Sequence, residues 1–452
     1  AKSIALFSQT AQTYTISNIG EFTLSDMIKM VKPELKTFIY EGKTLTGKEL
    51  QRIVALTKGN LKNDQNVLGK LQEIESQAKE IASKEGMTLS EYGAQRNKDS
   101  IFSPEEQLEI NKLAEDIRSK AEQAEPQITE DMLKLQVGGA YLTGLSHRLK
   151  STSSLSRKIE SDSVTPDGKT KIQDINISAS EIGDSVRYTL ILNEKNYTQG
   201  VEDSLKKLEE KGYKIKKIKN FWGGDIYQGI NTSIISPNGV VFELQFHTEL
   251  SFTTKEHLNH EYYEVSRSIF TSPESHLLSD DYMKITQSNV IRPEGVQNIK
   301  TQNFIELKSL SDYDLSKLHS IEKPNQTTFI FEGKKISFED YSLMIAFRDG
   351  NLKSDTGIFE KLKELGYKNI VVYTKGYENN LFTPEQKIEI GQLASDVRSK
   401  AERAEPQITE DMKLFEENGA YLTGLSHRLK SLESLERKIE SDSVSKDKYF
   451  SF

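Results

Sequence analysis

The chain of 452 residues contains no cysteine, one tryptophan and ten prolines. Without cysteine it forms neither disulfides nor thiolate metal sites, which agrees with a reducing compartment. It also lacks any run of ~20 consecutive apolar residues, the length that a membrane-spanning helix requires, and its first residues hold no apolar segment long enough for a secretory signal. These absences predict a protein that acts in the cytoplasm and does not enter a membrane.

A strong excess of positive charge is also missing, since 60 lysines and arginines stand against 68 aspartates and glutamates, for a net charge of −8. This balance argues against broad coating of a nucleic-acid backbone, which depends on neutralising phosphates with cations. One lysine-rich segment, residues 206–219, is more typical of a solvated helix end and strand than of a polyphosphate or RNA contact. The chain is longer than the length at which a single hydrophobic core stops growing, so two or three domains are expected.

Two parts of the chain are copies of each other. Gly139–Ser151 returns letter for letter as Gly419–Ser431, and Ala124–Met132 returns as Ala404–Met412. Two copies are too few for a solenoid, which requires at least three stacked repeats. The chain is therefore expected to contain a partial duplication.

The duplication extends upstream, where Thr37–Lys43 parallels Thr328–Lys334. The offset between the copies is different there, so the first copy holds an insertion between Asp64 and Phe102, which we place in the polar tract 83–100. Each copy is therefore predicted to begin with a small leading element that precedes its helices.

The helices of each copy have recognisable start signals. Ser103 and Thr383 each precede a proline and a glutamate, the pattern of an N-cap followed by the first helical turn. A second helix is expected to begin near Thr129, after Pro126, and to end at Gly138, where a left-handed conformation is easily adopted. Each copy is thus expected to hold two helices and then a basic loop.

Residues 171–270 follow a different, strand-rich pattern. The expected elements are a buried strand at 186–192, an amphipathic helix at 197–212, an edge strand from residue 213, a hairpin at 232–246 and a helix at 251–270. A mixed sheet flanked by helices, in the α+β class and with a duplicated helical segment on either side, is the favoured architecture.

The second copy passes Val444 and stops without this sheet. We therefore expect a repeat-unit domain at 1–123, the sheet domain at 124–271, a connector at 272–327 and a truncated copy at 328–452. Leu142, Leu145 and Leu149 are expected to pack on the sheet, and their counterparts in the second copy need another cover, from this chain or from another molecule. A reaction that needs groups from the repeat and from the sheet can occur in one copy at most.

A basic loop precedes the sheet. Arg148 and Lys150, followed by hydroxyls such as Ser154 and by Lys158, suit the binding of a triphosphate, because a guanidinium bridges two oxygens and a helix start adds N–H donors. A solvated basic helix turn is an equally common reading of this pattern. Asp184, just before a buried strand, is a candidate Mg²⁺ ligand, although an aspartate in this position is often only a turn residue.

The strand around Glu243 alternates between apolar and polar residues. Glu243 and Gln245 share one face, while Phe242 and Leu244 take the other, because successive side chains on a strand point to opposite sides. The polar face then continues to His247. This strand is predicted to present a carboxylate and an amide to a cleft.

A rival metal site lies in the following helix. Glu256, His260 and Glu264 recur every four residues, and three such groups could bind zinc. Because the sequence suggests no further ligand, a network of contacts within the helix is the favoured interpretation.

Four motifs occur in an order and spacing that resemble the synthetase domain of the RelA/SpoT family over about residues 128–267: Arg148-Leu-Lys150, Asp184, Tyr227-Gln-Gly-Ile-Asn-Thr-Ser and Glu243-Leu-Gln-Phe-His-Thr248. The resemblance implies a nucleotidyltransferase-like fold, transfer of pyrophosphate from ATP to the 3′-hydroxyl of a nucleotide, and Mg²⁺ as cofactor. Residues 184–189 and 255–267 look like a divergent branch of phage-associated and toxin-like proteins. The family's hydrolase domain has no counterpart upstream.

The resemblance also implies a role for each matching residue. Asp184 and Glu243 would be the catalytic pair and the metal ligands, with Glu243 as a base for the attacking hydroxyl. ATP phosphates would contact Arg148, Lys150, Ser154, Lys158 and Arg187. The acceptor would contact Tyr227, which stacks on its base, and Gln228, Asn231, Gln245 and His247. The family commonly has arginine where this chain has His247 and histidine where it has Asn231, so the departures concern guanosine specificity more than phosphate chemistry.

Two hypotheses of different classes follow. The first is an ATP-dependent pyrophosphokinase whose acceptor is a free purine nucleotide or an RNA 3′ end. The second is a catalytically degenerate nucleotide-binding module, or a phage- or virion-associated structural module. Under either hypothesis the second copy is a candidate surface for a protein partner or for self-association. The expected place of action is the cytoplasm, including that of a target cell reached through a phage or a secretion system.

Overall fold

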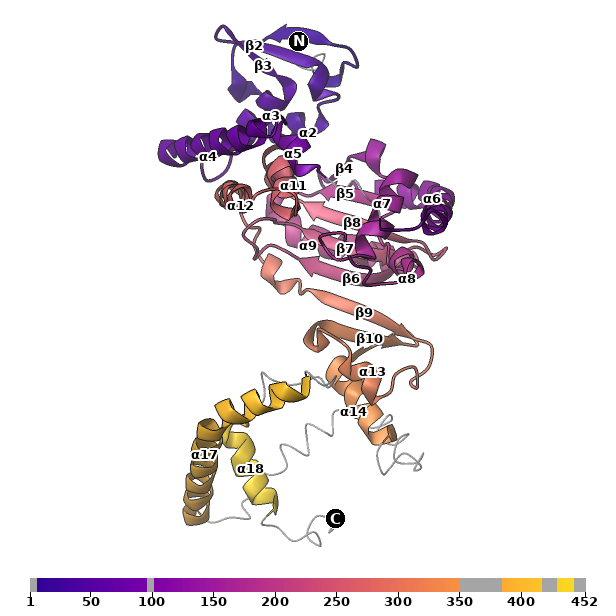
Figure 1. Cartoon of the computed structure of the whole chain (residues 1–452), viewed down its shortest axis with the longest axis vertical. Coiled ribbons are helices and arrows are strands. Elements are labelled where there is room, and N and C mark those ends of the chain that lie inside the picture. Colours follow the sequence, from indigo (N-terminus) through magenta and orange to yellow (C-terminus); the bar gives the residue numbers. More distant parts are fainter. Residues whose placement is uncertain (1–5, 96–100, 350–383, 417–428, 443–452) are drawn as a thin grey trace. The chain divides into compact units, whose positions relative to one another are not determined.

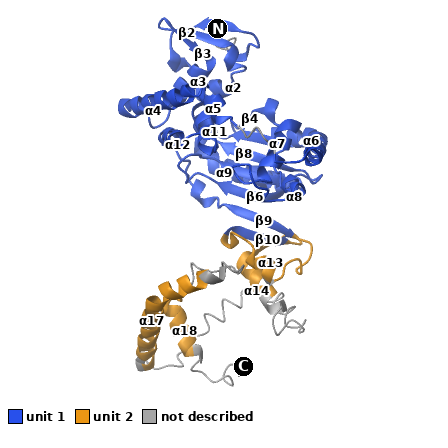
Figure 2. Cartoon of the chain, viewed as in Figure 1, with its two compact units in different colours: residues 1–306, 326–330 blue, residues 307–325, 331–452 orange. Residues whose placement is uncertain are grey.

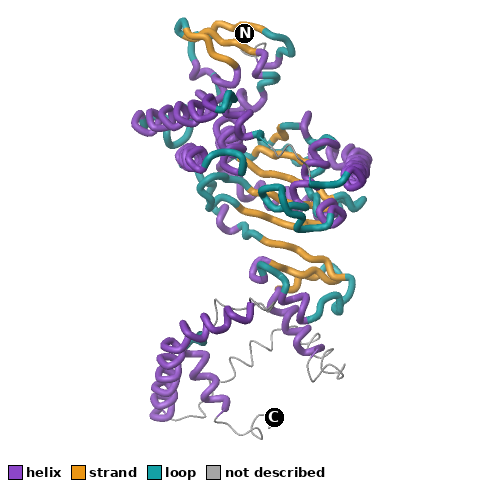
Figure 3. The backbone as a smooth tube through the Cα atoms, viewed as in Figure 1, coloured by secondary structure: helices purple, strands orange, loops and turns teal. Residues whose placement is uncertain are grey.

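The computed structural model describes residues 6–95, 101–349, 384–416 and 429–442. The chain divides into two compact units (Figure 2), of which unit 1 spans residues 1–306 and 326–330, and unit 2 spans residues 307–325 and 331–452. Helices and strands are mixed along the chain (Figure 3), so the α+β class predicted from the sequence is present. No helix within the described ranges is both long and apolar enough to cross a membrane.

Unit 1 begins with a small three-stranded module (Figure 1). Its elements are β1 (Gln12–Thr15), the short 3-10 helix η1 (Ile19–Glu21), α2 (Leu24–Lys29), η2 (Pro33–Leu35), β2 (Lys36–Tyr40), β3 (Lys43–Thr46) and α3 (Gly47–Leu56). β1 runs parallel to β2, and β2 antiparallel to β3. Glu41 and Gly42 take φ values of 46° and 75°, the pair of left-handed residues that a two-residue hairpin turn requires. Phe38 of β2 is fully buried in the module's core.

A layer of helices joins this module to the rest of unit 1. It contains α4 (Gln65–Lys84), α5 (Leu89–Gly93), α10 (Glu249–Thr253), the π-helix η5 (Thr254–Asn259), α11 (His260–Arg267) and α12 (Pro273–Gln287). Tyr262 and Tyr282 stack in its core with their ring centroids 3.7 Å apart. Arg52 of α3 binds Glu75 at 2.8 Å and the Tyr282 hydroxyl at 3.1 Å. Helices that precede the sheet in sequence therefore pack on helices that follow it, and α12 lies where only short connecting elements are predicted.

The large sheet supplies the frame of the candidate site. Its strands in unit 1 are β4 (Tyr141–Thr143), β5 (Arg187–Ile191), β6 (Lys214–Asn220), β7 (Ile230–Ile235), β8 (Val241–His247), β9 (Gln302–Leu307) and β10 (Thr327–Phe331). They lie in the order β10-β9-β6-β7-β8-β5-β4. β5 and β8 run parallel, whereas β4–β5, β6–β7 and β7–β8 are antiparallel. The sheet is mixed, as the sequence predicts.

The prediction that β6 is an edge strand is wrong. β6 pairs with β7 on one side and with β9 on the other, where Lys217 lies opposite Asn303. Lys214, Lys216 and Lys219 of β6 are exposed to solvent. The lysine alternation therefore reports a solvated sheet face, and it carries no information about whether the backbone of the strand is paired.

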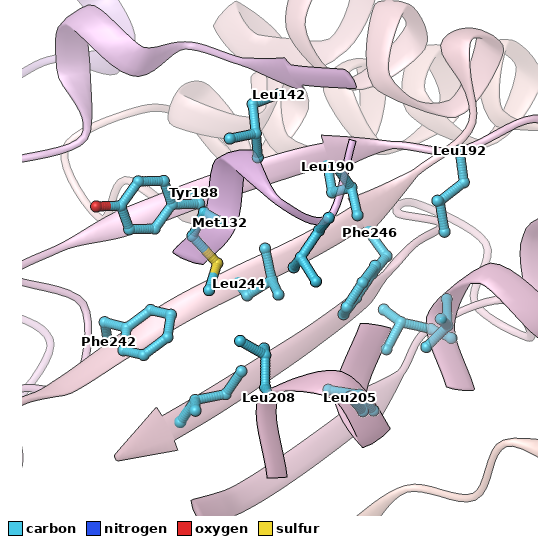
Figure 4. Close-up of a cluster of buried hydrophobic side chains, with 14 of the residues drawn as sticks. Met132, Leu142, Tyr188, Leu190, Leu192, Leu205, Leu208, Phe242, Leu244 and Phe246 are labelled. Carbon is cyan, nitrogen blue, oxygen red and sulfur yellow. The ribbon is translucent and has the colours of Figure 1, made fainter. Parts of the chain in front are cut away.

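One face of the sheet is apolar and covered by helices. Tyr188 and Leu190 of β5 share this face with Phe242 and Leu244 of β8, and Figure 4 shows them together with Met132 of α6 (Pro104–Leu133). α9 (Tyr197–Glu210) contributes further apolar residues to the same core. The alternate residues of β5 and β8 point to the opposite face, which carries the polar side chains.

The prediction of a helix break near Pro126 is also wrong. α6 is one continuous helix from Pro104 to Leu133, with Pro126 inside it. The ring of a proline removes one helical hydrogen bond, but Ala124 before it and Ile128 after it are both buried against the sheet. The packing of this face keeps the helix continuous across the proline.

Several short elements complete unit 1. They are α7 (Thr152–Asp162), α8 (Ile175–Ser180) and the 3-10 helices η3 (Leu145–His147), η4 (Glu194–Asn196) and η6 (Val296–Asn298). α7 and α8 pack on the N-terminal half of α6 around Leu155 and Ile159. This arrangement leaves the C-terminal half of α6 for the sheet.

Unit 2 repeats elements of the first copy. It contains α13 (Leu315–His319), β11 (Lys334–Ser337), α14 (Phe338–Asp349), α17 (Pro384–Glu416) and α18 (Leu432–Asp442), while η7 (Pro324–Gln326) precedes β10. Glu332 and Gly333 take φ values of 48° and 75°, the same turn as Glu41 and Gly42. α17, like α6, is one helix with a proline inside it. Where the second copy is described, its local structure is that of the first.

Some expectations for the second copy lie outside the described residues. Leu142 is buried in the core of the large sheet, with Leu145 and Leu149 packed against it. Of their counterparts, Leu429 is described and half-buried, whereas Leu422 and Leu425 are not among the described residues. Residues 350–383, which correspond to the part of the first copy where the insertion is expected, are not described either.

Candidate active site

The candidate site lies on the polar face of the sheet, where β5 and β8 run side by side. Gln245 donates from Nε2 to Glu243 Oε1 at 3.0 Å, so these two side chains lie on the same side of β8. Arg187 of β5 is the register partner of Glu243. The strand alternation therefore places a carboxylate and a guanidinium together on the face that α6 does not cover.

Four charged side chains meet at this place. Arg187 donates from Nη2 to Asp184 Oδ2 at 2.9 Å and from Nε to Glu243 Oε2 at 2.5 Å. Lys150 donates to the same oxygen of Asp184. One guanidinium thus joins the two acids that the sequence predicts as the catalytic pair, and both carboxylates lie on one side of the sheet. Their catalytic roles stay a prediction.

Backbone hydrogen bonds hold the basic loop against β5. The Lys150 N–H donates to the Ser185 carbonyl at 2.9 Å, and the Arg187 N–H donates to the Arg148 carbonyl at 2.7 Å. Leu149 and Val186 form an isolated antiparallel bridge between these bonds. The loop is therefore held on either side of Leu149, and the bond from the Lys150 N–H fixes where the ammonium of that residue meets Asp184.

Burial and ion pairing act in opposite directions on the pKa values of this cluster. Burial raises the pKa of Asp184, but Lys150, Lys158 and Arg187 outweigh it and hold that pKa below its usual value. Burial lowers the pKa of Lys150, and Asp184 offsets only part of that effect. Asp184 therefore stays ionised at neutral pH, as a site for cations requires.

One oxygen of Asp184 has an unused capacity to accept a ligand. Oδ1 is buried and has no hydrogen-bond partner among the described residues, which is rare for a carboxylate oxygen. Mg²⁺ takes one or two carboxylates and completes its shell with phosphate oxygens and water. The described part of the chain contains no group of three or more His, Asp or Glu residues that could hold a metal by themselves. The residues fit a Mg²⁺ that is shared with substrate phosphates.

Tyr227 and His247 form a second polar cluster beside the first. Tyr227 donates its hydroxyl hydrogen to Asn231 Oδ1 at 2.6 Å, and its oxygen lies 2.9 Å from His247 Nε2. His247 Nδ1 lies 2.9 Å from Ser251 Oγ. Because the Tyr227 hydrogen goes to Asn231, its oxygen accepts from Nε2–H, and Nδ1 accepts from Ser251. This chain of hydrogen bonds orients the phenol ring.

Both rings of this cluster are uncharged. His247 is fully buried, and burial followed by the charge of Lys255 lowers its pKa to about 3. Burial raises the pKa of the Tyr227 hydroxyl. The backbone at Gly229 passes so close that an added Cβ would lie 2.7 Å from His247 Cε1. Next to it, Gln228 Oε1 is buried without a hydrogen-bond partner among the described residues.

Three of the predicted phosphate ligands have partners outside the cluster. Arg148 binds Glu125 of α6 and also donates to a loop carbonyl. Lys158 pairs with Asp162 along α7 at 3.3 Å. The Ser154 N–H donates to the N-cap hydroxyl of α7 at 3.2 Å. The structure therefore brings Lys150, but not Arg148 or Ser154, into direct contact with the carboxylates.

The π-helix η5 adds two charged residues: Lys255, for which the sequence predicts no role, and Glu256, which the sequence places in the rival zinc trio. Lys255 Nζ lies 3.4 Å from Gln245 Oε1 and 2.7 Å from Glu256 Oε1. Burial opposes the ionisation of Glu256, but Lys255 outweighs it and lowers the pKa of Glu256 to about 2. Short π-helical turns often occur at functional sites, and no sequence pattern marks them. Lys255 extends the polar network that begins at Glu243.

The rival zinc trio makes ion pairs instead. Glu256 binds Lys255, and Glu264 binds Arg267 at 2.7 Å. The change from π-helix to α-helix at His260 interrupts the regular spacing on which the trio depends. These contacts account for both acids without a metal ion.

No family model and no curated protein matches the chain. Among solved structures, it is similar to one chain of the crystal structure of the complex between the type VI effector Tas1 and its immunity protein. The match has 16% identity and a TM-score of 0.25, and it covers 41% of this chain and 98% of that one. A likeness of this size carries no argument, so the interpretation of the site rests on its own residues.

His247→Gln is expected to reduce the acid sensitivity of the fold. The pKa of His247 is lowered from 6.5 to about 3. Below about pH 6.5 the unfolded chain therefore binds a proton that the folded chain excludes, and the free energy of unfolding falls with pH by up to ~1.4 kcal/mol per unit. Urea denaturation at a series of pH values measures this slope.

The control for this prediction is His147→Gln, because His147 is exposed. It should leave the slope unchanged. Half-buried His257, whose pKa burial lowers to about 4, should retain part of the slope in His247→Gln. Equal slopes in His247→Gln and in the original chain would contradict a buried neutral histidine.

Proposed function

We propose that the chain is an ATP-dependent pyrophosphokinase, which transfers the β- and γ-phosphoryl groups of ATP as one unit to the 3′-hydroxyl of a purine nucleotide or of an RNA end. The observation that carries the proposal is the cluster of Lys150, Asp184, Arg187 and Glu243 on one sheet face. Phosphoryl transfer depends on positioning and on charges around the migrating oxygens more than on covalent chemistry. This cluster contains two cationic and two anionic side chains within hydrogen-bond distance of one another.

In the proposed step, the acceptor 3′-oxygen attacks the β-phosphorus. The bond between that phosphorus and the α–β bridging oxygen breaks, so AMP leaves. The hydroxyl proton passes to Glu243, which must first exchange its hydrogen bond from Arg187 for one from the hydroxyl. Arg187 is then available to the phosphate oxygens, to which a guanidinium can make two parallel bonds.

Asp184 and Glu243 are the residues that would hold Mg²⁺. The Oδ1 atom of Asp184, which is buried without a hydrogen-bond partner among the described residues, supports this assignment. When bound, the ion supplies positive charge to phosphate oxygens and lowers the pKa of a hydroxyl beside it. Lys150 stays on Asp184 Oδ2, so the carboxylate is partly neutralised by the protein as well.

The acceptor is proposed to lie on the side of Tyr227. Its ring is held by Asn231 and His247, which favours a fixed platform for stacking on a base. Because both rings of this cluster are uncharged, recognition there relies on stacking and hydrogen bonds. Lys255 lies within hydrogen-bond distance of Gln245 on this side, and we assign it to an anionic group of the acceptor.

Lys255→Gln is expected to raise the KM for a nucleotide acceptor by about 10-fold or more, because a charge-assisted hydrogen bond contributes ~1.5–3 kcal/mol. The KM for ATP should stay the same, since Lys255 lies away from Lys150 along the network. Steady-state kinetics with each substrate varied in turn measure both values. The matched control is Lys195→Gln, an exposed lysine of η4. A rise in the KM for ATP alone would place Lys255 on the donor side.

A catalytically degenerate nucleotide-binding or structural module would keep the same fold without turnover. The melting temperature with Mg²⁺ and a non-hydrolysable ATP analogue separates the two, since a ligand that binds only the folded state raises it. Stabilisation together with product from labelled ATP, a panel of nucleotides and tRNA supports the enzyme. Stabilisation without any product supports the degenerate module. A reaction that uses ATP would take place in the cytoplasm, whether of the producing cell or of a target cell.

A further inference from the structure

In the first copy, the C-terminal half of α6 covers the apolar face of the sheet. Ala121, Ala124, Ile128 and Met132 are buried in one cluster with Tyr188 of β5, and Figure 4 shows Met132 beside Tyr188. Ile128 and Met132 are both 0% exposed. This half of the helix is therefore shaped by its contact with the sheet.

Polar contacts make the packing of α6 on the sheet specific. Thr129 Oγ1 lies 2.6 Å from the Tyr188 hydroxyl. Asp131 accepts from the Tyr213 hydroxyl at 2.9 Å and pairs with Lys211. Burial raises the pKa of Asp131, but Lys211 and the other donors outweigh it and lower that pKa to about 2. A buried acid is stable only where such partners are supplied, and here the turn between α9 and β6 supplies them.

The same surface recurs on α17. The sheet-facing residues of α6 return unchanged as Ala401, Ala404, Glu405, Ile408, Thr409, Asp411 and Met412. Ile408 is 57% exposed and Met412 41% exposed, where the identical residues of α6 are fully buried. Asp411 is exposed as well. Apolar side chains exposed together on one helix face are typical of an interaction surface.

The rest of the helical pair is folded alike in both copies. α17 buries Ile390 and Ala394, at 7% and 0% exposure, as α6 buries the residues at the same positions. Arg398 donates to the Lys430 carbonyl, and its counterpart in α6 makes the same bond. Leu393 and Val397 of α17 are exposed as well, at 48% and 45%, where their counterparts Leu113 and Ile117 are half-buried. The change in exposure between the copies is largest on the surface that receives a sheet in the first copy, where buried residues become exposed.

We propose that this surface of α17, the α17 face, docks on the apolar sheet face of a second copy of this chain, in place of that copy's α6. The α17 face consists of Ala401, Ala404, Glu405, Ile408, Thr409, Asp411 and Met412. A surface that fits the α17 face must offer apolar strand residues and a hydroxyl group to bind Thr409. It must also offer a cationic group and a second hydroxyl group to bind Asp411. Tyr188, Lys211 and Tyr213 of the second copy offer these groups.

The docking is an exchange of equivalent elements. Contacts that the sheet of the second copy loses when α6 leaves are regained from α17, while the displaced face of α6 becomes exposed in place of the α17 face. The entropy of association then makes the dimer depend on protein concentration. Any change that weakens α6 as a cover should shift the population towards the dimer. This inference does not depend on the proposed function.

The absence of cysteine allows a direct test with the full chain. One preparation carries Lys211→Cys and another carries Asp411→Cys; the two are mixed and treated with a short bis-maleimide. Each chain then has a single cysteine, so a linked peptide joining positions 211 and 411 can arise only between two chains. We expect this product, identified by mass spectrometry, and we expect its yield to rise with protein concentration.

The matched control replaces Asp411→Cys by Lys400→Cys. Lys400 is exposed on the same helix, and its counterpart Lys120 is exposed in the first copy too, so it lies away from the α17 face. The control yield should be at least ~5-fold lower, a difference of ~1 kcal/mol. Adding Ile408→Asp to the Asp411→Cys chain should reduce the yield to the control level.

A second variant strengthens the test in the opposite direction. Ile128→Asp with Met132→Asp, placed in the Lys211→Cys chain, weakens α6 as a cover and should raise the yield at least ~5-fold if that chain folds. If it does not fold, the comparison without these changes still decides. A 211–411 yield equal to the Lys400→Cys control, or insensitive to Ile408→Asp, would overturn the proposal.

Discussion

Changing Asp184 to Asn, or Glu243 to Gln, is expected to lower pyrophosphate transfer by ~10³-fold or more while the fold is retained. Asp184→Asn removes the charge that holds Lys150 and Arg187 and that fits a cation. Glu243→Gln removes the acceptor for the hydroxyl proton. Both substitutions conserve size, so packing should change little. Initial rates of AMP formation from labelled ATP measure the loss, and thermal unfolding checks the fold.

Two matched controls test whether the loss is local. Asp174→Asn makes the same change at the N-cap of α8, a position that asparagine caps equally well. Glu306→Gln makes the other change on an exposed strand residue that pairs with Lys214 at the surface. Both controls should keep the original rate. Near-normal rates in Asp184→Asn or in Glu243→Gln would contradict the assigned roles.

Lys150→Ala is expected to lower kcat/KM for ATP by ~10²-fold, the usual cost of removing one well-placed donor for developing charge. The duplication provides the control, because Lys430 follows α17 as Lys150 follows α6, but no described acid corresponds to Asp184 beside it. Lys430→Ala should therefore leave kcat/KM unchanged. Measuring AMP formation over a range of ATP concentrations, at low protein concentration, gives both values.

Equal losses from Lys150→Ala and Lys430→Ala would contradict a single site in the first copy.

Arg148→Ala should lower catalysis less than Lys150→Ala does, because the Arg148 guanidinium is already bound to Glu125 and to a loop carbonyl. We expect that variant to lose stability instead.

The parts of the fold that the sequence predicted are those set by neighbouring residues. The alternation of Phe242 and Leu244 with Glu243 and Gln245 was sufficient to assign the two faces of β8. The hairpin of β7 and β8, the helix α9 and the N-cap at Ser103 follow from signals within a few residues. The duplication could likewise be seen directly, and the Glu-Gly turns repeat in both copies.

The errors arose where distant residues decide the structure. Pro126 suggests a helix end when read alone, but the buried residues around it pack on a sheet that follows later in the chain, and this packing keeps α6 continuous. β6 has the sequence of an edge strand, yet β9, about 90 residues further on, pairs with it. Local patterns do not report such partners.

In the candidate site, too, the sequence predicted what local patterns determine and missed what distant residues determine. The residue types were predictable, because a carboxylate between apolar strand residues is unusual and the basic loop has a recognisable composition. The contacts were not, since Arg187 meets Glu243 only through the register of β5 on β8, and Lys255 enters only because helix η5 is wound as a π-turn. The roles of all the site residues, including Ser154, Lys158 and Gln228, remain predictions, as does the binding of Mg²⁺.

The most direct test of the central claim uses ATP labelled separately on its β- and γ-phosphates, with Mg²⁺, a panel of purine nucleotides and tRNA as acceptors. The account predicts that both labels appear in the same product and that one AMP forms for each product, with no transfer in Asp184→Asn. Release of the γ-label alone, with ADP as the second product, would contradict pyrophosphate transfer. So would the absence of any labelled product from folded protein that binds the ATP analogue.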